Sequence, residues 1–115
     1  MRSSISASEY GRLAETLAAT WLRLRGYRIL GRNVRVAGRE IDVVARRGHT
    51  LVVCEVKARR SRRRGAPAEA VDPRKQRRLA EAGEMLLAAH PDAERVRFDV
   101  IAVDGLRVRH FPAAF

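Results

Sequence analysis

The stretch GREIDVVARRGHTLVVCEVK, residues 38–57, decides the fold. It contains two apolar runs, residues 40–46 and 51–57, with Gly48 in the short segment between them. Two runs of strand length around a short glycine-containing turn are typical of a β-hairpin. The second run is apolar on both faces, which predicts a covered strand in the centre of a sheet.

A turn made of Gly48 and His49 defines a hypothetical register for this hairpin. It places Asp42 opposite Glu55 and Glu40 opposite Lys57. Directly opposed side chains on neighbouring strands have Cβ atoms about 4.5–5.5 Å apart. The register therefore predicts two adjacent carboxylates with Lys57 within reach, whereas a longer turn would shift the pairing.

Opposed carboxylates at positions 42 and 55 repel each other, so their pairing does not stabilise a sheet. We expect one of them to have a raised pKa, partly relieved by Lys57. A divalent cation removes the repulsion, and oxygen-only ligands favour Mg²⁺ or Mn²⁺. Such a metal polarises a phosphodiester and activates a bound water, which Lys57 would orient. The alternative is an ordinary surface cluster with a Glu40–Lys57 ion pair.

The remaining segments predict helices around a sheet. Residues 7–25 have an apolar stripe at helical spacing, preceded by a capping box and followed by a glycine. The residues of the stripe are Tyr10, Leu13, Leu17, Trp21 and Leu24. A second helix begins at Asp72-Pro73 and runs to about Ala89, with Leu79, Ala82 and Leu86 on its apolar face.

Three further strands are predicted over residues 27–36, 97–103 and 106–111, with a turn at Asp104-Gly105 before the last. The element order is then α-β-β-β-α-β-β. It predicts one α/β domain over residues 1–115, with a mixed sheet flanked by helices. Asp99 lies in the strand before the turn, and we expect it to pair with an arginine.

The charge balance points to a polyanionic partner. The 115 residues contain 24 Lys and Arg against 13 Asp and Glu, a net charge of +11. Nucleic acid is the simplest such partner, with DNA the expected form, although a basic membrane-surface protein would have the same balance. A single cysteine excludes an intrachain disulfide, and no apolar run reaches the roughly 18 residues of a membrane span. We expect a soluble cytoplasmic protein without a membrane partner.

Two features of the cationic residues are informative. Five arginines lie within six positions, namely Arg59, Arg60, Arg62, Arg63 and Arg64. Like charges this dense repel unless an anion is present, which favours phosphate contact over a merely solvated loop. Only Lys57 and Lys75 are lysines among the 24 cationic residues. Lys75, in the first turn of the second helix, is assigned with the arginines to phosphate binding.

Asp42 followed by Glu55-Val56-Lys57 resembles the PD-(D/E)XK nuclease superfamily, in which an acidic residue on one strand precedes E-x-K on the next. More closely, the chain is similar to the YraN family of small bacterial proteins. The matching segments are GRLAETLAATWL, GYRILGRN, EIDVVA, VCEVKARR, KQRRL and RFDVIAV. The resemblance implies a restriction-endonuclease-like core related to archaeal Holliday junction resolvases, with Glu15 as a fourth site residue.

The leading hypothesis is a Mg²⁺- or Mn²⁺-dependent endonuclease-like protein that acts on structured or branched DNA. Its catalytic residues would be Asp42, Glu55, Lys57 and Glu15, the first two as metal ligands. Resolvases act as dimers, so the resemblance leaves a homodimer open, with no dimer surface legible in the sequence. Two other classes also stay open: a non-catalytic nucleic-acid-binding protein that retains the nuclease fold, and an accessory of ribosome or RNA metabolism.

Overall fold

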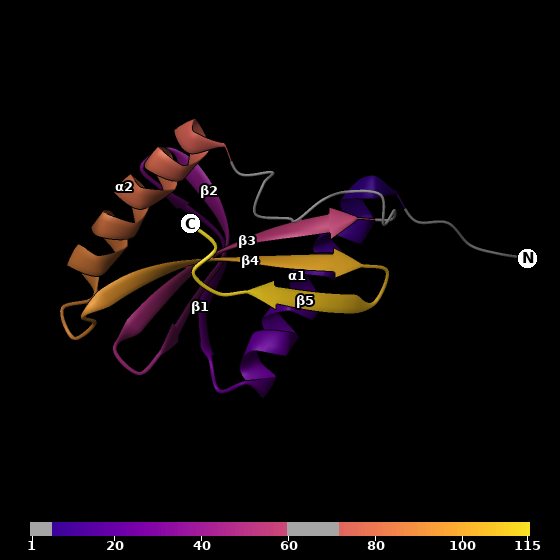
Figure 1. Cartoon of the computed structure of the whole chain (residues 1–115), viewed down its shortest axis with the longest axis horizontal. Coiled ribbons are helices and arrows are strands. Elements are labelled where there is room, and N and C mark those ends of the chain that lie inside the picture. The colour runs from indigo at the N-terminus through magenta and orange to yellow at the C-terminus, as the bar shows by residue number, and fades with distance from the viewer. Residues whose placement is uncertain (1–5, 60–71) are drawn as a thin grey trace, which may run out of the picture.

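The computed structural model describes residues 6–59 and 72–115. They form a five-stranded mixed sheet in the order β1-β2-β3-β4-β5, with α1 and α2 packed on opposite faces (Figure 1). Only the β3–β4 pair is parallel. The elements are α1 (Ala7–Leu24), β1 (Arg28–Val36), β2 (Arg39–Arg47), β3 (Thr50–Arg59), α2 (Pro73–Ala89), β4 (Arg95–Asp104) and β5 (Arg107–Phe111). The predicted α/β class and element order are confirmed.

Helix α1 has the predicted ends but a different buried face. Its capping box is present, and Gly26 follows it with a φ of +88°, in the left-handed region that glycine adopts without strain. Ala14, Ala18 and Leu22 are fully buried, whereas Leu13 and Leu24 are 38% and 76% exposed, so their placement in the apolar stripe was wrong. The small alanines face the sheet. The helix is therefore rotated about its own axis, compared with the orientation that its large apolar residues predict.

The hairpin of β2 and β3 has the predicted register only near its turn. Pairing runs from Arg47↔Thr50 to Val43↔Cys54 and ends there. The predicted backbone pairs beyond it do not form, because β2 continues along β1, where Glu40 pairs with Arg35. Figure 1 shows β2 and β3 separating on this side of the sheet. The interpretation of β3 as the central strand is confirmed.

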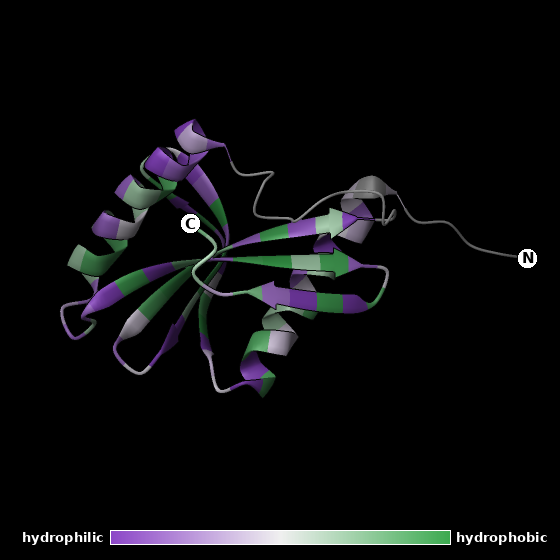
Figure 2. Cartoon of the chain, in the orientation of Figure 1, coloured by the Kyte–Doolittle hydropathy of each residue, from purple (hydrophilic) through white to green (hydrophobic). Residues whose placement is uncertain are grey.

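Two apolar clusters stabilise the two faces of the sheet. In Figure 2 apolar residues run along the central strands, and polar residues colour much of the N-terminal part of α2. Val43 packs in the cluster on the α1 face, whereas Ile41, two residues earlier, packs in the cluster on the α2 face. The regular alternation of sides is therefore broken at Asp42, which lies between them.

Helix α2 begins at its predicted N-cap and lies close to β4. Its buried residues are Leu79, Ala82, Gly83 and Leu86, which confirms the predicted apolar face. A Cβ atom added to Gly83 would lie 2.8 Å from Cζ of Phe98, so any larger residue here would displace the Phe98 ring. Neither helix in the described part of the chain is long and apolar enough to cross a membrane.

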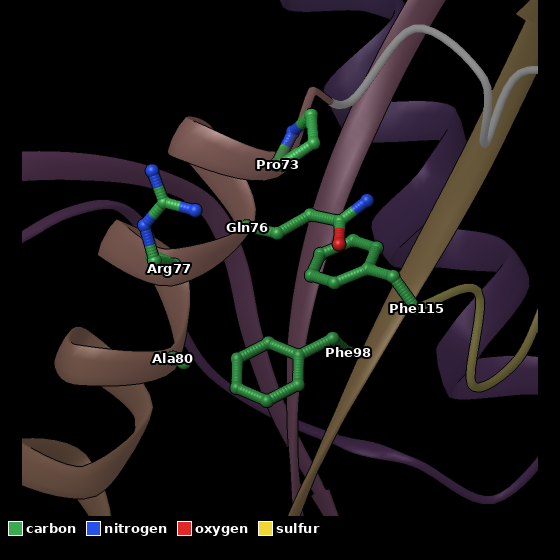
Figure 3. Close-up of a pocket in the computed structure, with 6 residues that line it drawn as sticks. All are labelled: Pro73, Gln76, Arg77, Ala80, Phe98 and Phe115. Carbon is green, nitrogen blue, oxygen red and sulfur yellow. The ribbon is translucent and has the colours of Figure 1, made fainter.

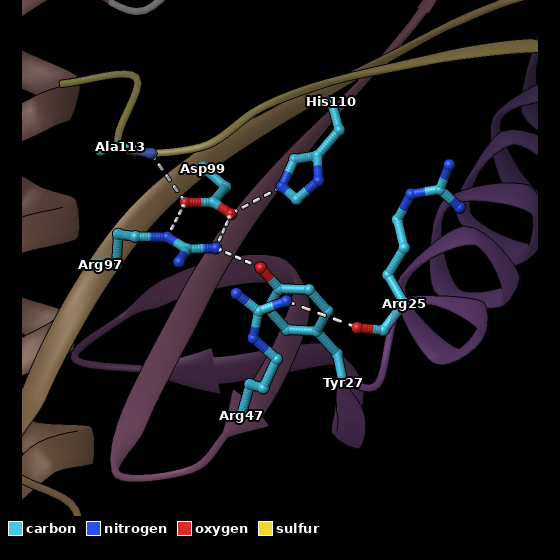
Figure 4. Close-up of polar contacts among 7 residues, drawn as sticks. All are labelled: Arg25, Tyr27, Arg47, Arg97, Asp99, His110 and Ala113. Carbon is cyan, nitrogen blue, oxygen red and sulfur yellow. Dashed lines mark hydrogen bonds and ion pairs between the residues drawn. The ribbon is translucent and has the colours of Figure 1, made fainter.

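A buried polar network joins β4 to β5 and to the end of the chain (Figure 4). Asp99 is fully buried and accepts hydrogen bonds from Arg97 at 2.8 and 2.7 Å, from His110 at 2.7 Å and from the Ala113 amide at 3.0 Å. Burial alone would raise the pKa of Asp99, but these donors lower it to about 2. The predicted arginine partner is confirmed.

The connection between β4 and β5 is shifted by one residue from its prediction. Asp104 pairs with Arg107, so the two turn residues are Gly105 and Leu106 rather than Asp104 and Gly105. Gly105 has a φ of +64°. Its amide donates to the Tyr10 hydroxyl at 2.7 Å, which ties this turn to the start of α1.

Candidate functional site

The candidate site lies where β2 and β3 separate. Here Asp42 Oδ2 accepts a hydrogen bond from the Val56 amide at 2.8 Å. The carboxylate thus bridges the two strands just beyond their last backbone pair, Val43↔Cys54. Asp42 and Glu55 therefore come together at a fork in the sheet rather than as an opposed pair in a regular ladder.

The pKa of Asp42 is raised to about 6. Burial is the largest cause, and the charges of Glu55 and Glu15 raise the pKa further. The Val56 amide and the Lys75 ammonium act in the opposite direction. The predicted upward shift is confirmed, but burial exceeds like-charge repulsion, and the relieving lysine is Lys75 rather than Lys57.

Glu55 extends from β3 toward α2. Its side chain is 12% exposed and pairs with the Lys75 ammonium, which the first turn of α2 carries to it. Lys57 Nζ lies 3.6 Å from the same carboxylate oxygen. The two lysines of the chain thus meet at one carboxylate. Lys57 contacts Glu55, within the predicted carboxylate cluster, rather than Glu40 as in the alternative interpretation. Lys75, assigned above to phosphate binding, is part of the carboxylate cluster.

Glu15 reaches the fork from α1. Its carboxylate accepts a hydrogen bond from Asn33 Nδ2 at 3.1 Å and lies 3.8 Å from Arg32 Nη2. Asn33 has a φ of +52°, a left-handed conformation that asparagine tolerates better than most residues. The contact with Asn33 was missed in the sequence; the GYRILGRN segment, which contains it, was the available signal.

Asp42 and Glu55 are the two carboxylates of the fork that carry the predicted metal site. Within residues 6–59 and 72–115, no group of three or more His, Cys, Asp or Glu side chains is placed to hold a metal ion. Glu15 is thus near enough to affect the pKa of Asp42 without joining such a group. Mg²⁺ is commonly held by one or two carboxylates and keeps several waters. In the described structure, Glu55 is paired with the Lys75 ammonium.

The arginine run begins at the end of β3. Arg59 is the last residue of β3, and its carbonyl accepts a hydrogen bond from the Tyr10 hydroxyl at 2.9 Å. Arg60, Arg62, Arg63 and Arg64 lie outside the described residues, so their predicted contact with phosphate stays a prediction.

Comparison with known proteins identifies the family. The model of "Uncharacterised protein family UPF0102" matches residues 14–103. This range includes every side chain of the fork described above. The chain belongs to the UPF0102 family. This is the family also called YraN, so the resemblance stated from the sequence is confirmed.

Several UPF0102 proteins are similar to the chain over most of its length. It is 49% identical to one from Anaeromyxobacter dehalogenans, over 91% of this chain and 82% of that protein. One from Syntrophotalea carbinolica is 46% identical, over 91% of this chain and 89% of the relative. A third, from Acidothermus cellulolyticus, is 41% identical with both chains fully covered.

Proposed function

We propose that this UPF0102 protein is a metal-dependent endonuclease that cleaves structured or branched DNA. The observation that carries the proposal is the fork itself. Asp42, with a pKa raised to about 6, lies there beside Glu55, and each of them interacts with the Lys75 ammonium. Perturbed carboxylates next to a lysine are frequent at catalytic sites, because burial and like charge are tolerated where they serve chemistry.

The metal ligands in this proposal are Asp42 and Glu55. A bound Mg²⁺ or Mn²⁺ would polarise the phosphodiester and lower the pKa of a coordinated water. Asp42 must lose its proton to act as a ligand, so cation binding should weaken as the pH falls below about 6. The hydrogen bond from the Val56 amide keeps its carboxylate oriented in either protonation state.

The two lysines have separate tasks. Before the cation binds, the Lys75 ammonium pairs with Glu55. When the cation displaces this ammonium, Lys75 would contact a phosphate oxygen. Lysine suits this task because its ammonium is a compact point charge on a flexible stem. Lys57, 3.6 Å from the same carboxylate, stays beside the site to orient the attacking water. Glu15, held by Asn33, adds negative charge that attracts the cation.

DNA as the substrate is supported by charge. The net charge of +11 favours a polyanion, and the arginine run begins at the last residue of β3. Phosphate contacts from such residues contribute affinity that is independent of sequence. A preference for branched DNA would then depend on how the site accommodates a distorted DNA backbone beside the carboxylates.

A second candidate is a nucleic-acid-binding protein that keeps this fold without cleaving. The pairing of Lys75 with Glu55 favours it, because the ammonium already neutralises one of the two carboxylates. The same residues would then stabilise the fork instead of binding a metal.

A cleavage assay with Mg²⁺ or Mn²⁺ separates the two candidates. The substrates are linear duplex, flaps, splayed forks and four-way junctions. We expect the wild type to cleave at least one branched DNA, and Asp42→Asn to abolish this activity. Glu40→Gln is the matched control, since it removes the same charge from an exposed position of β2. Equal cleavage by wild type and Asp42→Asn would refute the proposed site.

A further inference from the structure

A pocket of about 360 Å³ lies between α2 and β4 (Figure 3). It is lined by Pro73, Gln76, Arg77, Ala80, Phe98 and Phe115. The Phe98 and Phe115 rings are stacked, with centroids 5.4 Å apart and planes inclined by 24°. Figure 3 shows Gln76 extending from α2 above Phe115. The pocket therefore combines an aromatic surface with the amide and guanidinium groups of α2.

The pocket is on the same face of the sheet as Glu55. Phe98 and Val100 both pack in the cluster on the α2 face, and Val100 pairs with Glu55. Two residues along a strand span about 6.6 Å, roughly two base steps of a stacked nucleic-acid strand. On α2, Lys75 contacts Glu55 while the next residue, Gln76, lines the pocket.

The charges around the pocket favour an anionic ligand. Arg74, Arg77 and Arg78 are exposed on the same part of α2, and the first turn of this helix contains no acidic residue. The aromatic surface favours a planar ring, and the amide and guanidinium groups can hydrogen-bond the edge of such a ring. A planar ring with polar edges, linked to a phosphate, is a nucleotide.

We propose that this pocket binds one unpaired nucleobase of the DNA, beside the phosphate that lies at the carboxylates. The proposal rests on the proposed function and narrows its substrate class. A base inside a duplex is stacked and paired, so it cannot enter a pocket without being extruded. Flaps, bulges and splayed forks are therefore better substrates than a linear duplex or a fully paired four-way junction.

Fluorescence of 2-aminopurine, an adenine analogue whose emission is quenched when it stacks, tests the proposal. The analogue is placed in turn at each unpaired position of a flap DNA, and binding is measured in Ca²⁺ so that cleavage does not contribute. We expect quenching by the wild type at one position next to the duplex. A fully paired duplex that carries the same analogue should show no such change.

Two pairs of matched variants test whether the quenching arises in this pocket. Ala80→Leu fills the pocket from an exposed helical position, and Ala88→Leu makes the same change at another exposed position of α2. Arg77→Gln and Arg78→Gln remove the same charge, but only Arg77 lines the pocket. Ala80→Leu should remove the quenching and weaken flap binding roughly 5- to 150-fold, the effect of one base–aromatic stack. Arg78→Gln should weaken flap and duplex binding equally, whereas Arg77→Gln should weaken flap binding more.

Unchanged quenching and affinity in Ala80→Leu would overturn the proposal. An Ala80→Leu variant that has a lower Tm without DNA but unchanged quenching would also overturn it. The added side chain would then clash with protein atoms that already fill the pocket. Position-specific quenching without cleavage of any substrate in Mg²⁺ would leave the pocket assignment intact and refute the nuclease. Cleavage that depends on Asp42, without quenching at any position, would support the nuclease and refute the pocket assignment.

Discussion

Asp42 Oδ2 accepts a hydrogen bond from the Val56 amide at 2.8 Å, across the point where β2 and β3 separate. This contact holds the carboxylate in a half-buried position, where its charged form is disfavoured. The carboxylate that would bind the cation is therefore one that destabilises the metal-free protein at neutral pH.

Asp42→Asn should stabilise the metal-free protein at pH 7–8. The pKa of Asp42 is about 6 in the folded protein against an ordinary value of 3.8. Below about pH 4 both states hold the proton, and the residue contributes no penalty. Between about pH 4 and 6 only the unfolded chain gives up the proton. The free energy of unfolding therefore falls by roughly 2–3 kcal/mol over this range, and it stays lower above pH 6. Asparagine avoids this loss and still accepts the Val56 hydrogen bond.

Urea unfolding at pH 4 and pH 7.5 measures the effect. The gain of Asp42→Asn should be fully present at pH 7.5 and mostly lost at pH 4. Glu40→Gln, at an exposed position of the same strand, should show no such difference. A gain of equal size at both pH values would mean that the ionisation of Asp42 is not its source.

Mg²⁺ should raise the Tm of the wild type and not that of Asp42→Asn. The cation requires the ionised carboxylate, so its binding releases protons increasingly as the pH falls toward 6. Calorimetric heats at pH 6.5 should therefore differ between buffers of different ionisation enthalpy. Identical heats across these buffers would contradict a carboxylate that titrates in this range.

Lys75→Gln should increase Mg²⁺ affinity and decrease the cleavage rate. The substitution removes the ammonium that pairs with Glu55, so Mg²⁺ no longer competes with it for that carboxylate. It also removes the charge that would contact phosphate. Arg74→Gln is the control, since it removes one positive charge from the adjacent exposed position. A Lys75→Gln variant with lower Mg²⁺ affinity would assign the lysine to support of the site instead.

Asp99→Asn should destabilise the protein by about 3–5 kcal/mol at neutral pH, because it leaves Arg97 without its buried counter-charge. The stabilising effect of the ionised Asp99 is present above about pH 4 and is lost as the pH falls toward its folded pKa of about 2. Asp92→Asn provides the comparison: its side chain is 75% exposed and pairs with Arg46 at 3.0 Å. That exposed pair should contribute at most about 1 kcal/mol. Equal destabilisation by the two substitutions would show that burial of Asp99 is irrelevant.

The sequence predicted the local parts of the fold well. Turn length determines the pairing next to a turn, which is why the register from Arg47 to Val43 is correct. The end of that pairing was not predictable, because it depends on β2 following β1 past Val43. For α1 the prediction favoured large apolar residues over alanines, and it placed Leu24 in the core in error.

The candidate site was predictable as a set of residues but not as a set of contacts. Asp42, Glu55 and Lys57 follow from strand pairing and family resemblance. The pairing of Lys75 with Glu55 depends on how α2 packs across the sheet, which no local pattern encodes. The contact of Glu15 with Asn33 depends in the same way on how α1 packs beside β1.

Replacement of Arg62, Arg63 and Arg64 by alanine should separate DNA binding from chemistry. Removal of one phosphate-binding arginine should lower the slope of log K against log salt by about one unit, so the triple variant should show a decrease of up to about three. Its binding should weaken for every DNA tested, and cleavage at saturating DNA should persist. Asp42→Asn should abolish cleavage and retain binding. Its affinity in Ca²⁺ should be close to that of the wild type or slightly higher, because it removes a negative charge that faces phosphate. A triple variant with the affinity and salt slope of the wild type would show that the run does not bind phosphate.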